Sequence, residues 1–311
     1  TVSYDEEKCK TTIKKISTET ETKIVIFTSE FPVENSIEYM IKDIIINLSP
    51  KSKLIYIING STYQYLKNDT EYYEINSSKL DDYIKVFNEI KSCNFIFFFG
   101  SSPSISETSS SSNVKDQFER ISTLNGLAIM YIIQALNKNK IKTPKLCLFT
   151  KGIYEYLSAQ PKFDEIQQIS ETVFYQGGIW GIGRTIAIEH PEYCCLRLDL
   201  PSGKENLYKC ALLILNEIFR RIEGNTVEDE IIFSKDFTKK FSPILSPVKK
   251  QNHQKNLQFN QKKSVIITGG LGGVGLKFLE YLIKKPHSMK QFILLSRNEP
   301  NTSTQQHLNR S

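Results

Sequence analysis

The sequence contains no uninterrupted run of roughly 18 apolar residues, the length that a membrane-spanning helix needs. Its amino end, TVSYDEEKCKTTIKK, also lacks the basic and then apolar order of a secretory signal. These two absences argue against an integral membrane protein and against an exported one. The sequence therefore predicts a soluble, cytoplasmic protein with no membrane partner.

Signs of disulfide or metal chemistry are few. The six cysteines form no CxxC pair, and Cys147, Cys194 and Cys195 lie in apolar, strand-like runs, which favours reduced thiols in a cytosolic protein. His253, His287 and His307 cluster with no cysteine or carboxylate at metal-ligand spacing. His190 precedes Pro191 at the end of a predicted helix, which favours a capping or surface histidine over a general base. We therefore expect no metal site.

The charge balance is nearly even. Forty Lys and Arg stand against 34 Asp and Glu, which leaves a net charge of +6. This surplus is small for 311 residues, and no series of aromatic residues is interleaved with the lysines, so the sequence does not indicate a nucleic-acid partner. The length, with 40% hydrophobic and 24% charged residues, is typical of about two folded domains.

Six short segments rich in Ile, Phe, Leu and Val predict strands buried on both faces, because their apolar residues are nearly continuous. These segments are residues 22–28, 53–59, 94–99, 145–150, 194–200 and 229–233. Helical periodicity is found at residues 34–48, 81–91, 115–138, 178–190 and 204–223. This alternation predicts an α/β fold, with a Rossmann-like, mostly parallel sheet and helices on both faces.

Two polar segments interrupt the alternation. Residues 101–113, SSPSISETSSSSN, predict a surface loop. Residues 234–263 contain many lysines, two prolines and no sustained period, which indicates a linker or an arm over a neighbouring domain. We therefore predict a first domain at residues 1–233, this linker at 234–263, and a second unit at 264–311.

Three residues in the predicted helix 178–190 are conspicuous. Trp180 is the only tryptophan, and packing against the sheet is its simplest explanation. Arg184 and Glu189 could pair across helical turns or bind at an interface between the two predicted domains. The sequence leaves these two alternatives open.

A glycine-rich turn follows the linker. Residues 264–268 form a short apolar strand, and the next seven positions are crowded with glycines. A helical stripe and a second strand at residues 292–295 come next. A strand, a glycine turn, a helix and a strand within about 35 residues are the context of a dinucleotide-binding fingerprint, and they predict the first βαβ of a second Rossmann unit.

Two overlapping patterns fit this turn. Gly270, Gly272 and Gly275 have the GxGxxG spacing, and Thr268 with Gly269, Gly273 and Gly275 has the TGxxxGxG spacing. Glycines let backbone amides approach a pyrophosphate, and the positive end of the following helix favours its negative charge. The candidate cofactor-binding residues are Thr268, Gly269, Gly270, Leu271, Gly272, Gly273, Val274 and Gly275. A glycine-rich turn with no ligand is the alternative.

The residues after the second strand indicate which dinucleotide is bound. Asp or Glu at this point holds the ribose 2′-hydroxyl of NAD, whereas the 2′-phosphate of NADP favours Arg. Here Leu295 is followed by Ser296, Arg297 and Asn298, with Glu299 next. Ser296 and Arg297 complete the candidate site, and the charge favours NADPH over NADH. An ordinary surface role for Arg297 is the alternative.

Three segments carry a family resemblance. TGGLGGVG (Thr268–Gly275), followed by LLSRN (Leu294–Asn298), resembles the opening of the ketoreductase domain of type I polyketide synthases and animal-type fatty acid synthases, a branch of the short-chain dehydrogenase/reductases. GGIWGIGRTIAIEHPEYCCLRLDLP (Gly177–Pro201) looks like the structural half-domain that precedes the catalytic one. FSKDFTKKFSPIL (Phe233–Leu245) is similar to the strand and arm between the halves. Before residue 140 only the α/β pattern matches.

This resemblance implies a cofactor-free structural half-domain followed by the start of an NADPH-binding catalytic half-domain. The segment after the first strand, SEFP (Ser29–Pro32), agrees because it has no glycine fingerprint. In the family, NADPH reduces a carrier-bound β-ketoacyl thioester to a β-hydroxyacyl thioester. The resemblance therefore also implies a polyketide synthase as the parent protein, a carrier domain with phosphopantetheine, other synthase domains as partners and a homodimeric parent.

The resemblance places the catalytic Tyr, Ser and Lys or Asn beyond the second strand. Residues 296–311 contain no tyrosine, and Tyr281 lies within the predicted helix, so we assign no catalytic residue. Since the chain starts at Thr1 rather than Met, we expect a segment of a longer synthase that is inactive by itself. A truncated remnant that serves as a non-catalytic scaffold, and an unrelated NADP-binding regulator, are the alternatives.

Overall fold

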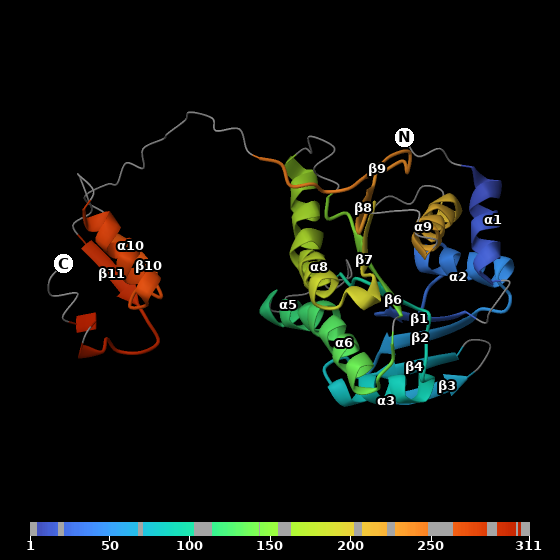
Figure 1. Cartoon of the computed structure of the whole chain (residues 1–311), viewed down its shortest axis with the longest axis horizontal. Coiled ribbons are helices and arrows are strands. Elements are labelled where there is room, and N and C mark those ends of the chain that lie inside the picture. The colour runs from blue at the N-terminus through green and yellow to red at the C-terminus, as the bar shows by residue number, and fades with distance from the viewer. Residues whose placement is uncertain are drawn as a thin grey trace. The chain divides into compact units, whose positions relative to one another are not determined.

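A computed structural model of the chain describes most of the sequence (Figure 1). The described residues are 5–17, 22–67, 71–102, 114–142, 144–154, 163–201, 207–222, 228–247, 264–284, 291–302 and 304–305. They belong to two compact units, Thr1–Ile244 and Leu245–Ser311, each with its own sheet. Most of the predicted loop at 101–113, the second half of the predicted linker, and His253, His287 and His307 lie outside the described residues.

The first unit contains a nine-stranded sheet in the part of the chain that is described, in the order β3-β4-β2-β1-β5-β6-β7-β8-β9. The strands are β1 (Lys23–Thr28), β2 (Lys53–Asn59), β3 (Gln64–Lys67), β4 (Glu71–Ile75), β5 (Phe95–Phe99), β6 (Lys145–Lys151), β7 (Leu196–Leu200), β8 (Glu230–Phe233) and β9 (Lys240–Phe241). All pairs from β4 to β8 are parallel, and the outermost strands β3 and β9 are antiparallel to their neighbours. The predicted α/β fold with a mostly parallel sheet is confirmed.

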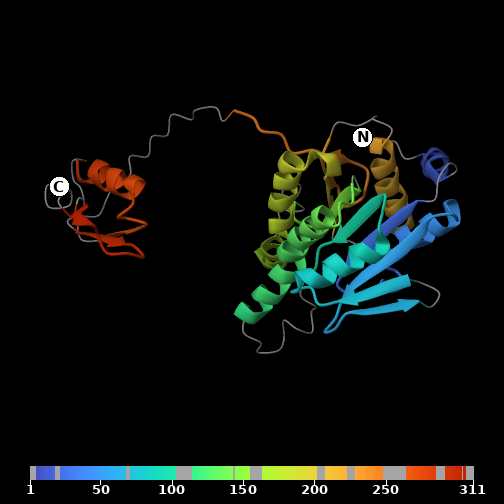
Figure 2. The same ribbon diagram turned by 60° about the horizontal axis from the view of Figure 1, so that its bottom comes forward.

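Helices cover both faces of this sheet (Figures 1 and 2). One face carries α1 (Glu6–Ser17), α2 (Ile37–Leu48) and α9 (Leu207–Ile222), which contact one another. The other carries α3 (Leu80–Ile90), α6 (Ala128–Lys138) and α8 (Phe163–Glu189). The helix α5 (Val114–Ser122) leads into α6 through a π-helical turn, η1 (Thr123–Leu127).

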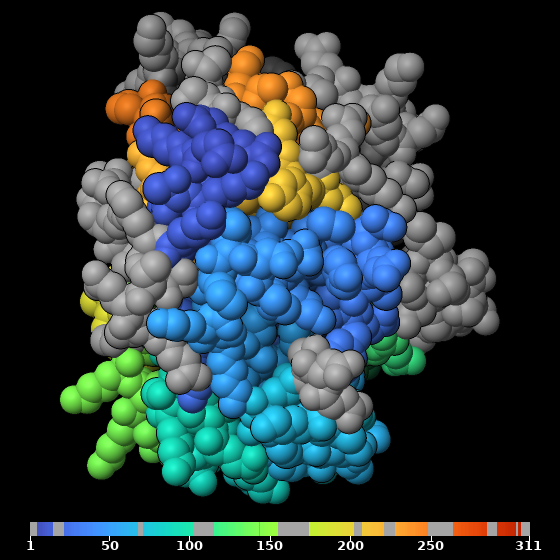
Figure 3. Space-filling model, turned by 90° about the vertical axis from the view of Figure 1, so that its right-hand side faces the viewer, coloured from blue at the N-terminus to red at the C-terminus, as the bar shows by residue number. Residues whose placement is uncertain are grey.

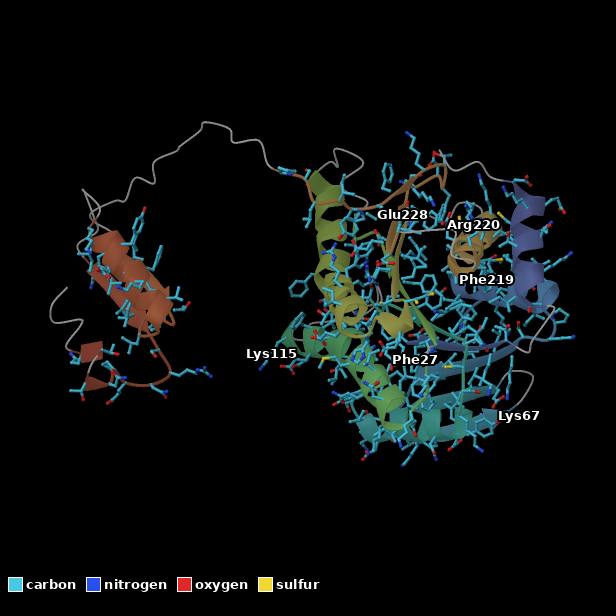
Figure 4. All side chains as sticks on the ribbon, in the orientation of Figure 1. Phe27, Lys67, Lys115, Phe219, Arg220 and Glu228 are labelled. Carbon is cyan, nitrogen blue, oxygen red and sulfur yellow. The ribbon has the colours of Figure 1, made fainter. Side chains whose placement is uncertain are left out.

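Strand β5 shows how the sheet separates two apolar cores. Phe95 and Phe97 belong to the core beneath α2 and α9, whereas Ile96 and Phe98 belong to the core beneath α3 and α6. The ring of Phe95 meets that of Phe219 on α9 edge to face, with centroids 5.5 Å apart (Figure 4). Because successive side chains of a strand point to opposite faces, its continuous apolar sequence is buried on both sides.

Four elements were not among the predicted ones. The strands β3 (QYLK) and β4 (EYYEI) mix tyrosines with charged and polar residues at one end of the sheet, so they lack a continuous apolar run. The strand β9 has only two residues and lies inside the predicted linker, so residues 234–244 belong to the first unit. The helix α1 is mostly charged, and it packs against α9 and α2 (Figure 3) through few apolar residues, of which Cys9 and Ile13 are buried.

The helix α8 begins at Phe163, well before the predicted start at residue 178. Trp180 is buried, and its Nε1 donates a hydrogen bond of 2.8 Å to Thr150 Oγ1 of β6, which confirms packing against the sheet. The pairing of Arg184 with Glu189 is wrong, because the Arg184 guanidinium donates to both oxygens of Glu230 on β8, at 2.7 and 2.9 Å. The helix is thus tied to the sheet by polar side chains as well as by apolar packing.

Two glycines of α8 allow a matched test of this packing. A Cβ on Gly181 would meet nothing within 4 Å, whereas one on Gly183 would lie 2.6 Å from Arg197 Cδ. Arg197 is buried and held by a hydrogen bond of 3.1 Å to the Gly183 carbonyl, so it cannot move away cheaply. We expect Gly181→Ala to stabilise the unit by about 0.5–1 kcal/mol and Gly183→Ala to destabilise it by about 1–3 kcal/mol. Urea unfolding followed by tryptophan fluorescence measures both, and effects of the same sign would contradict the packing described.

The cluster formed by Glu230, Arg184 and Arg197 gives a prediction for pH dependence. Burial raises the pKa of Glu230, but the hydrogen bonds and charges of the two arginines outweigh it and hold the pKa below its ordinary value of 4.5. A depressed carboxyl pKa contributes stability above the unfolded pKa, and this contribution is lost as pH falls through the folded pKa. We therefore expect the stability lost in Glu230→Gln to be largest at neutral pH and to shrink progressively below about pH 4.5 in urea titrations. A loss that does not change with pH would contradict this.

The second unit is a single βαβ in the described residues. It consists of β10 (Ser264–Thr268), α10 (Gly273–Ile283) and β11 (Gln291–Leu295), with β10 and β11 parallel. Ile267 of β10 packs with Leu279 and Leu282 of α10. No described residue of this unit covers the other face of the two-stranded sheet, and Ile266 is 60% exposed. A helix covers only one face, so this unit has the pattern of a fragment of a larger parallel sheet.

Candidate cofactor-binding site

The candidate site is the turn between β10 and α10. β10 ends at Thr268 and α10 begins at Gly273, so the chain reverses within four residues. Gly269 has a φ of +66°, in the left-handed region that favours glycine. This residue therefore sets the direction in which the chain leaves the strand.

Gly270 and Gly275 are required by close packing. A Cβ on Gly270 would lie 2.9 Å from both the Ile267 carbonyl oxygen and Leu294 Cβ. A Cβ on Gly275 would lie 2.5 Å from the Gly269 carbonyl oxygen. Both positions let the helix, the turn and β11 approach one another more closely than any side chain would permit.

The backbone amides of the turn have different roles. Gly270 N donates to the Leu295 carbonyl of β11 at 3.1 Å, and Gly272 N donates to the Gly269 carbonyl at 3.0 Å. These two amides therefore hold the turn together. The first amides of α10, at Gly273, Val274 and Gly275, have no carbonyl one turn earlier within the helix, so they are the donors that an anion would use.

The space in front of these amides fits a phosphate group. Gly272 precedes the helix as its N-cap and supplies no side-chain capping hydrogen bond. A Cβ on Gly273 would meet nothing within 4 Å, and Val274 is 87% exposed. The end of the helix is thus open and carries no acidic residue in its first turn. These features suit the pyrophosphate of a dinucleotide.

The residues that follow β11 lie at the same edge of the sheet as the turn. Thr268 and Leu295 are paired at the ends of the two parallel strands, so Ser296 and Arg297 leave the sheet beside the glycine turn. Both residues are exposed. The structure thus brings the two predicted parts of the site, residues 268–275 and residues 296–297, to one edge.

In the first unit, the described residues after β1 form no comparable turn. At the end of β1 the ring of Phe27 (Figure 4) packs against Tyr83 and Phe98, with centroids 6.1 and 6.4 Å apart. The following helix α2 has its end capped by Ser36 Oγ, which accepts a hydrogen bond from Tyr39 N at 3.1 Å. A shallow pocket at the ends of β1, β2, β4 and β5 is lined by apolar and hydroxyl or amide residues without a charged one. This crevice offers no cationic or open-helix partner for a phosphate.

Buried polar side chains at the ends of β5, β6 and β7 were not singled out from the sequence. Asp199 accepts hydrogen bonds from Thr150 Oγ1 at 2.8 Å, from Ile153 N at 3.1 Å and from Tyr154 N at 2.8 Å. Gln176 of α8 accepts from Lys151 N at 2.8 Å and donates to the Gly100 carbonyl at 3.0 Å. Each satisfies backbone groups of neighbouring loops, which is a structural role. The sequence signal for Asp199 was a carboxylate inside an apolar strand.

Other predicted features are distributed as follows. His190 lies next to the 3-10 turn η2 (Pro191–Tyr193), and its Nδ1 is 3.1 Å from Glu192 Oε1, as expected of a surface histidine. Among the residues that the structure describes, no cluster of His, Cys, Asp or Glu could hold a metal ion. None of the described helices combines the length and the hydrophobicity that crossing a bilayer requires.

No family model matches the chain, whereas comparison with solved structures finds proteins of similar fold, of which two are described. An N-terminal ketoreductase from a macrolactin assembly line has a TM-score of 0.58 at 17% identity, over 94% of this chain and 52% of that one. A multidomain structure of a keto acid-selecting NRPS module, with adenylation, ketoreductase and pseudo Asub domains, has a TM-score of 0.67 at 14% identity. That match covers 94% of this chain and 22% of the other.

A curated protein with a similar sequence is a polyketide synthase subunit. This relative, a phenolphthiocerol/phthiocerol polyketide synthase subunit of Mycobacterium tuberculosis, is 24% identical over 141 residues, which are 45% of this chain and 6% of that protein. The matched region is thus a small part of the relative's length. The resemblance predicted from Thr268–Gly275 and Gly177–Pro201 is confirmed: the chain has the fold of the ketoreductase domains found in polyketide synthase and NRPS modules.

Proposed function

We propose that the chain is the ketoreductase region of a multidomain polyketide synthase. Residues 1–244, the first unit, are its cofactor-free structural half-domain, residues 245–263 the connecting segment, and residues 264–311 the start of the NADPH-binding catalytic half-domain. The parent reaction is the NADPH-dependent reduction of a carrier-bound β-ketoacyl thioester to a β-hydroxyacyl thioester. The likeness of the fold to ketoreductase domains of such modules supports this proposal.

The observation that carries the proposal is the open end of α10. The amides of Gly273, Val274 and Gly275 bind the pyrophosphate, and the helix dipole adds to the attraction. Gly270 and Gly275 keep the turn narrow enough for a close approach of the backbone, since a Cβ on either would meet a neighbouring atom within 3 Å, and Gly269 supplies the left-handed φ of +66°. When bound, NADPH supplies the hydride for the reduction.

The first unit is proposed to hold no cofactor of its own. Aromatic packing around Phe27 and the capped α2 leave no phosphate site among the described residues at the end of β1. Other domains of the synthase and an acyl thioester on the phosphopantetheine of a carrier domain are the proposed partners, in a homodimeric, cytoplasmic parent. The similarity to part of a polyketide synthase supports the partner assignment.

These 311 residues are proposed to bind NADPH without reducing a substrate. No tyrosine follows Tyr281, which lies inside α10, so no candidate proton donor stands downstream of the fingerprint. The experiment is a titration with NADPH and NADH, followed by cofactor fluorescence. Saturable binding that favours NADPH is expected. Either no response to NADPH or an equal response to NADH would remove the assignment of NADPH as the cofactor.

Arg297 is the proposed source of the preference for NADPH. Its guanidinium can form charge-assisted hydrogen bonds with the 2′-phosphate, which NADH lacks. We expect Arg297→Ala to raise the Kd for NADPH by roughly tenfold and to leave the Kd for NADH unchanged. The control is Lys284→Ala, which removes the same charge at the far end of α10. A similar weakening of both cofactors by Arg297→Ala would rule out recognition of the 2′-phosphate.

A further inference from the structure

A cysteine and a lysine are held side by side at the start of β6 and β7. The two strands are parallel, with Cys147 paired to Leu196, so the same register places Lys145 beside Cys194 two residues earlier. Lys145 Nζ lies 3.0 Å from Cys194 Sγ and donates a hydrogen bond to it. Their proximity therefore follows from the sheet register and not from a chance surface contact.

The position of Cys194 is fixed by the turn that precedes it. Cys194 is the C-cap of η2, and its amide donates to the Pro191 carbonyl at 3.1 Å. The residue adopts φ 44° and ψ 50°, and its Sγ also lies 4.0 Å from the Glu192 carbonyl oxygen. The sulfur is thus held against the lysine by a defined backbone.

Access distinguishes Cys194 from the other cysteines. No disulfide joins any of the six, all of which the structure describes, and Cys194 alone among them is not buried. Within the described part of the chain, Lys145 Nζ forms no ion pair with a carboxylate, so the sulfur is its side-chain partner. A small oxidant can therefore reach a sulfur that already has an amine in contact with it.

We propose that Cys194 and Lys145 are a peroxide-sensitive modification site that closes into a covalent sulfur–nitrogen bond. Hydrogen peroxide first oxidises the thiol by two electrons: a sulfur–oxygen bond forms, the oxygen–oxygen bond breaks, and one water leaves. The Lys145 ammonium passes one proton to solvent, and its nitrogen then attacks the sulfenic sulfur. The sulfur–oxygen bond breaks, and the departing hydroxide takes a proton from the nitrogen to leave as a second water. The peroxide is reduced, and the protein loses two hydrogen atoms in addition to that proton.

This link would join the starts of two neighbouring strands without moving them. A sulfenic acid condenses with a nearby nucleophile when one is available and is otherwise oxidised further to the irreversible sulfinic acid. Lys145 thus protects Cys194 from overoxidation, and a thiol reductant restores both side chains. The site is independent of the glycine turn, so its test does not depend on cofactor binding.

The experiment treats the full 311-residue chain with hydrogen peroxide and maps the peptides by mass spectrometry without reduction. The expected product is a peptide pair joined through residues 145 and 194, lighter by two hydrogen atoms and released by dithiothreitol. Cys194→Ser should abolish it. Lys145→Met should abolish it and yield sulfinic acid at Cys194, whereas the matched control Lys151→Met, on the same strand, should retain it.

Three results would overturn the proposal. The first is Cys194 in the untouched or sulfinic form in the wild-type chain, with no joined peptide. The second is a joined peptide that carries an additional oxygen, since this would exclude the direct sulfur–nitrogen bond. The third is equal overoxidation of Cys194 in the wild type and in Lys145→Met. Far-ultraviolet circular dichroism of each variant before treatment ensures that the comparison is made on folded protein.

Discussion

Replacement of Gly273 by aspartate is expected to abolish NADPH binding while leaving the chain folded. The new side chain has room, because a Cβ at this position would meet nothing within 4 Å, and an acidic residue suits the first turn of a helix. Its carboxylate would lie at the open end of α10, where the pyrophosphate is proposed to bind, and would repel it. We expect the Kd for NADPH to rise by about 100-fold or more, measured by cofactor fluorescence.

The matched control for this variant is Gly178→Asp. Gly178 is an exposed glycine of α8 in the first unit, and a Cβ on it would also meet nothing within 4 Å. The control introduces the same charge into a helix without touching the glycine turn, so NADPH binding should stay at the wild-type level. Unchanged binding in Gly273→Asp would refute the assignment of the α10 amides to the pyrophosphate.

Replacement of Asp199 by alanine should produce the largest loss of stability in the first unit. The carboxylate is buried and accepts hydrogen bonds from Thr150 Oγ1, Ile153 N and Tyr154 N. Its removal leaves buried donors without their acceptor. The resulting loss of stability is larger than the net contribution of an ordinary hydrogen bond, because each donor stays buried without a partner. We expect the free energy of unfolding to fall by about 3–5 kcal/mol.

Urea unfolding followed by tryptophan fluorescence suits this prediction, since Trp180 is the only tryptophan and donates to Thr150, which also donates to Asp199. Asp43→Ala is the control, because Asp43 is exposed on α2 and its replacement should change stability by less than about 0.5 kcal/mol. A loss in Asp199→Ala that is no greater than in this control would contradict the structural role of the carboxylate.

The parts of the fold that the sequence predicted are those with a strong local signal. The run FIFFF of β5 is apolar at every position because both of its faces are buried, and such a run is visible without knowledge of its neighbours. β4 is also a parallel strand, yet Tyr72 and Glu74 are only partly buried near the end of the sheet. Its identity as a strand depends on pairing with β2, which no local pattern reveals.

The candidate site also has features that the sequence predicted and features that depend on the tertiary fold. Glycine spacing identified the turn, because the positions at which the turn has no room for a side chain lie within a few residues of one another in the sequence. The distinct role of Gly270, whose amide is taken by the Leu295 carbonyl, could not be predicted, since it depends on a strand that lies 25 positions further along the chain. The pairing of Arg184 with Glu230 is another contact set by the tertiary fold, which brings α8 against β8.

The most direct test of the account is to record the backbone amide signals of the isotopically labelled chain by NMR during a titration with NADPH. We expect the amides of Gly273, Val274 and Gly275 to shift most. Gly270 should shift less because its amide stays bonded to Leu295, and the amides around Phe27 in the first unit should not shift. Shifts that concentrate at the end of β1, or no shifts in the glycine turn at saturating NADPH, would contradict it.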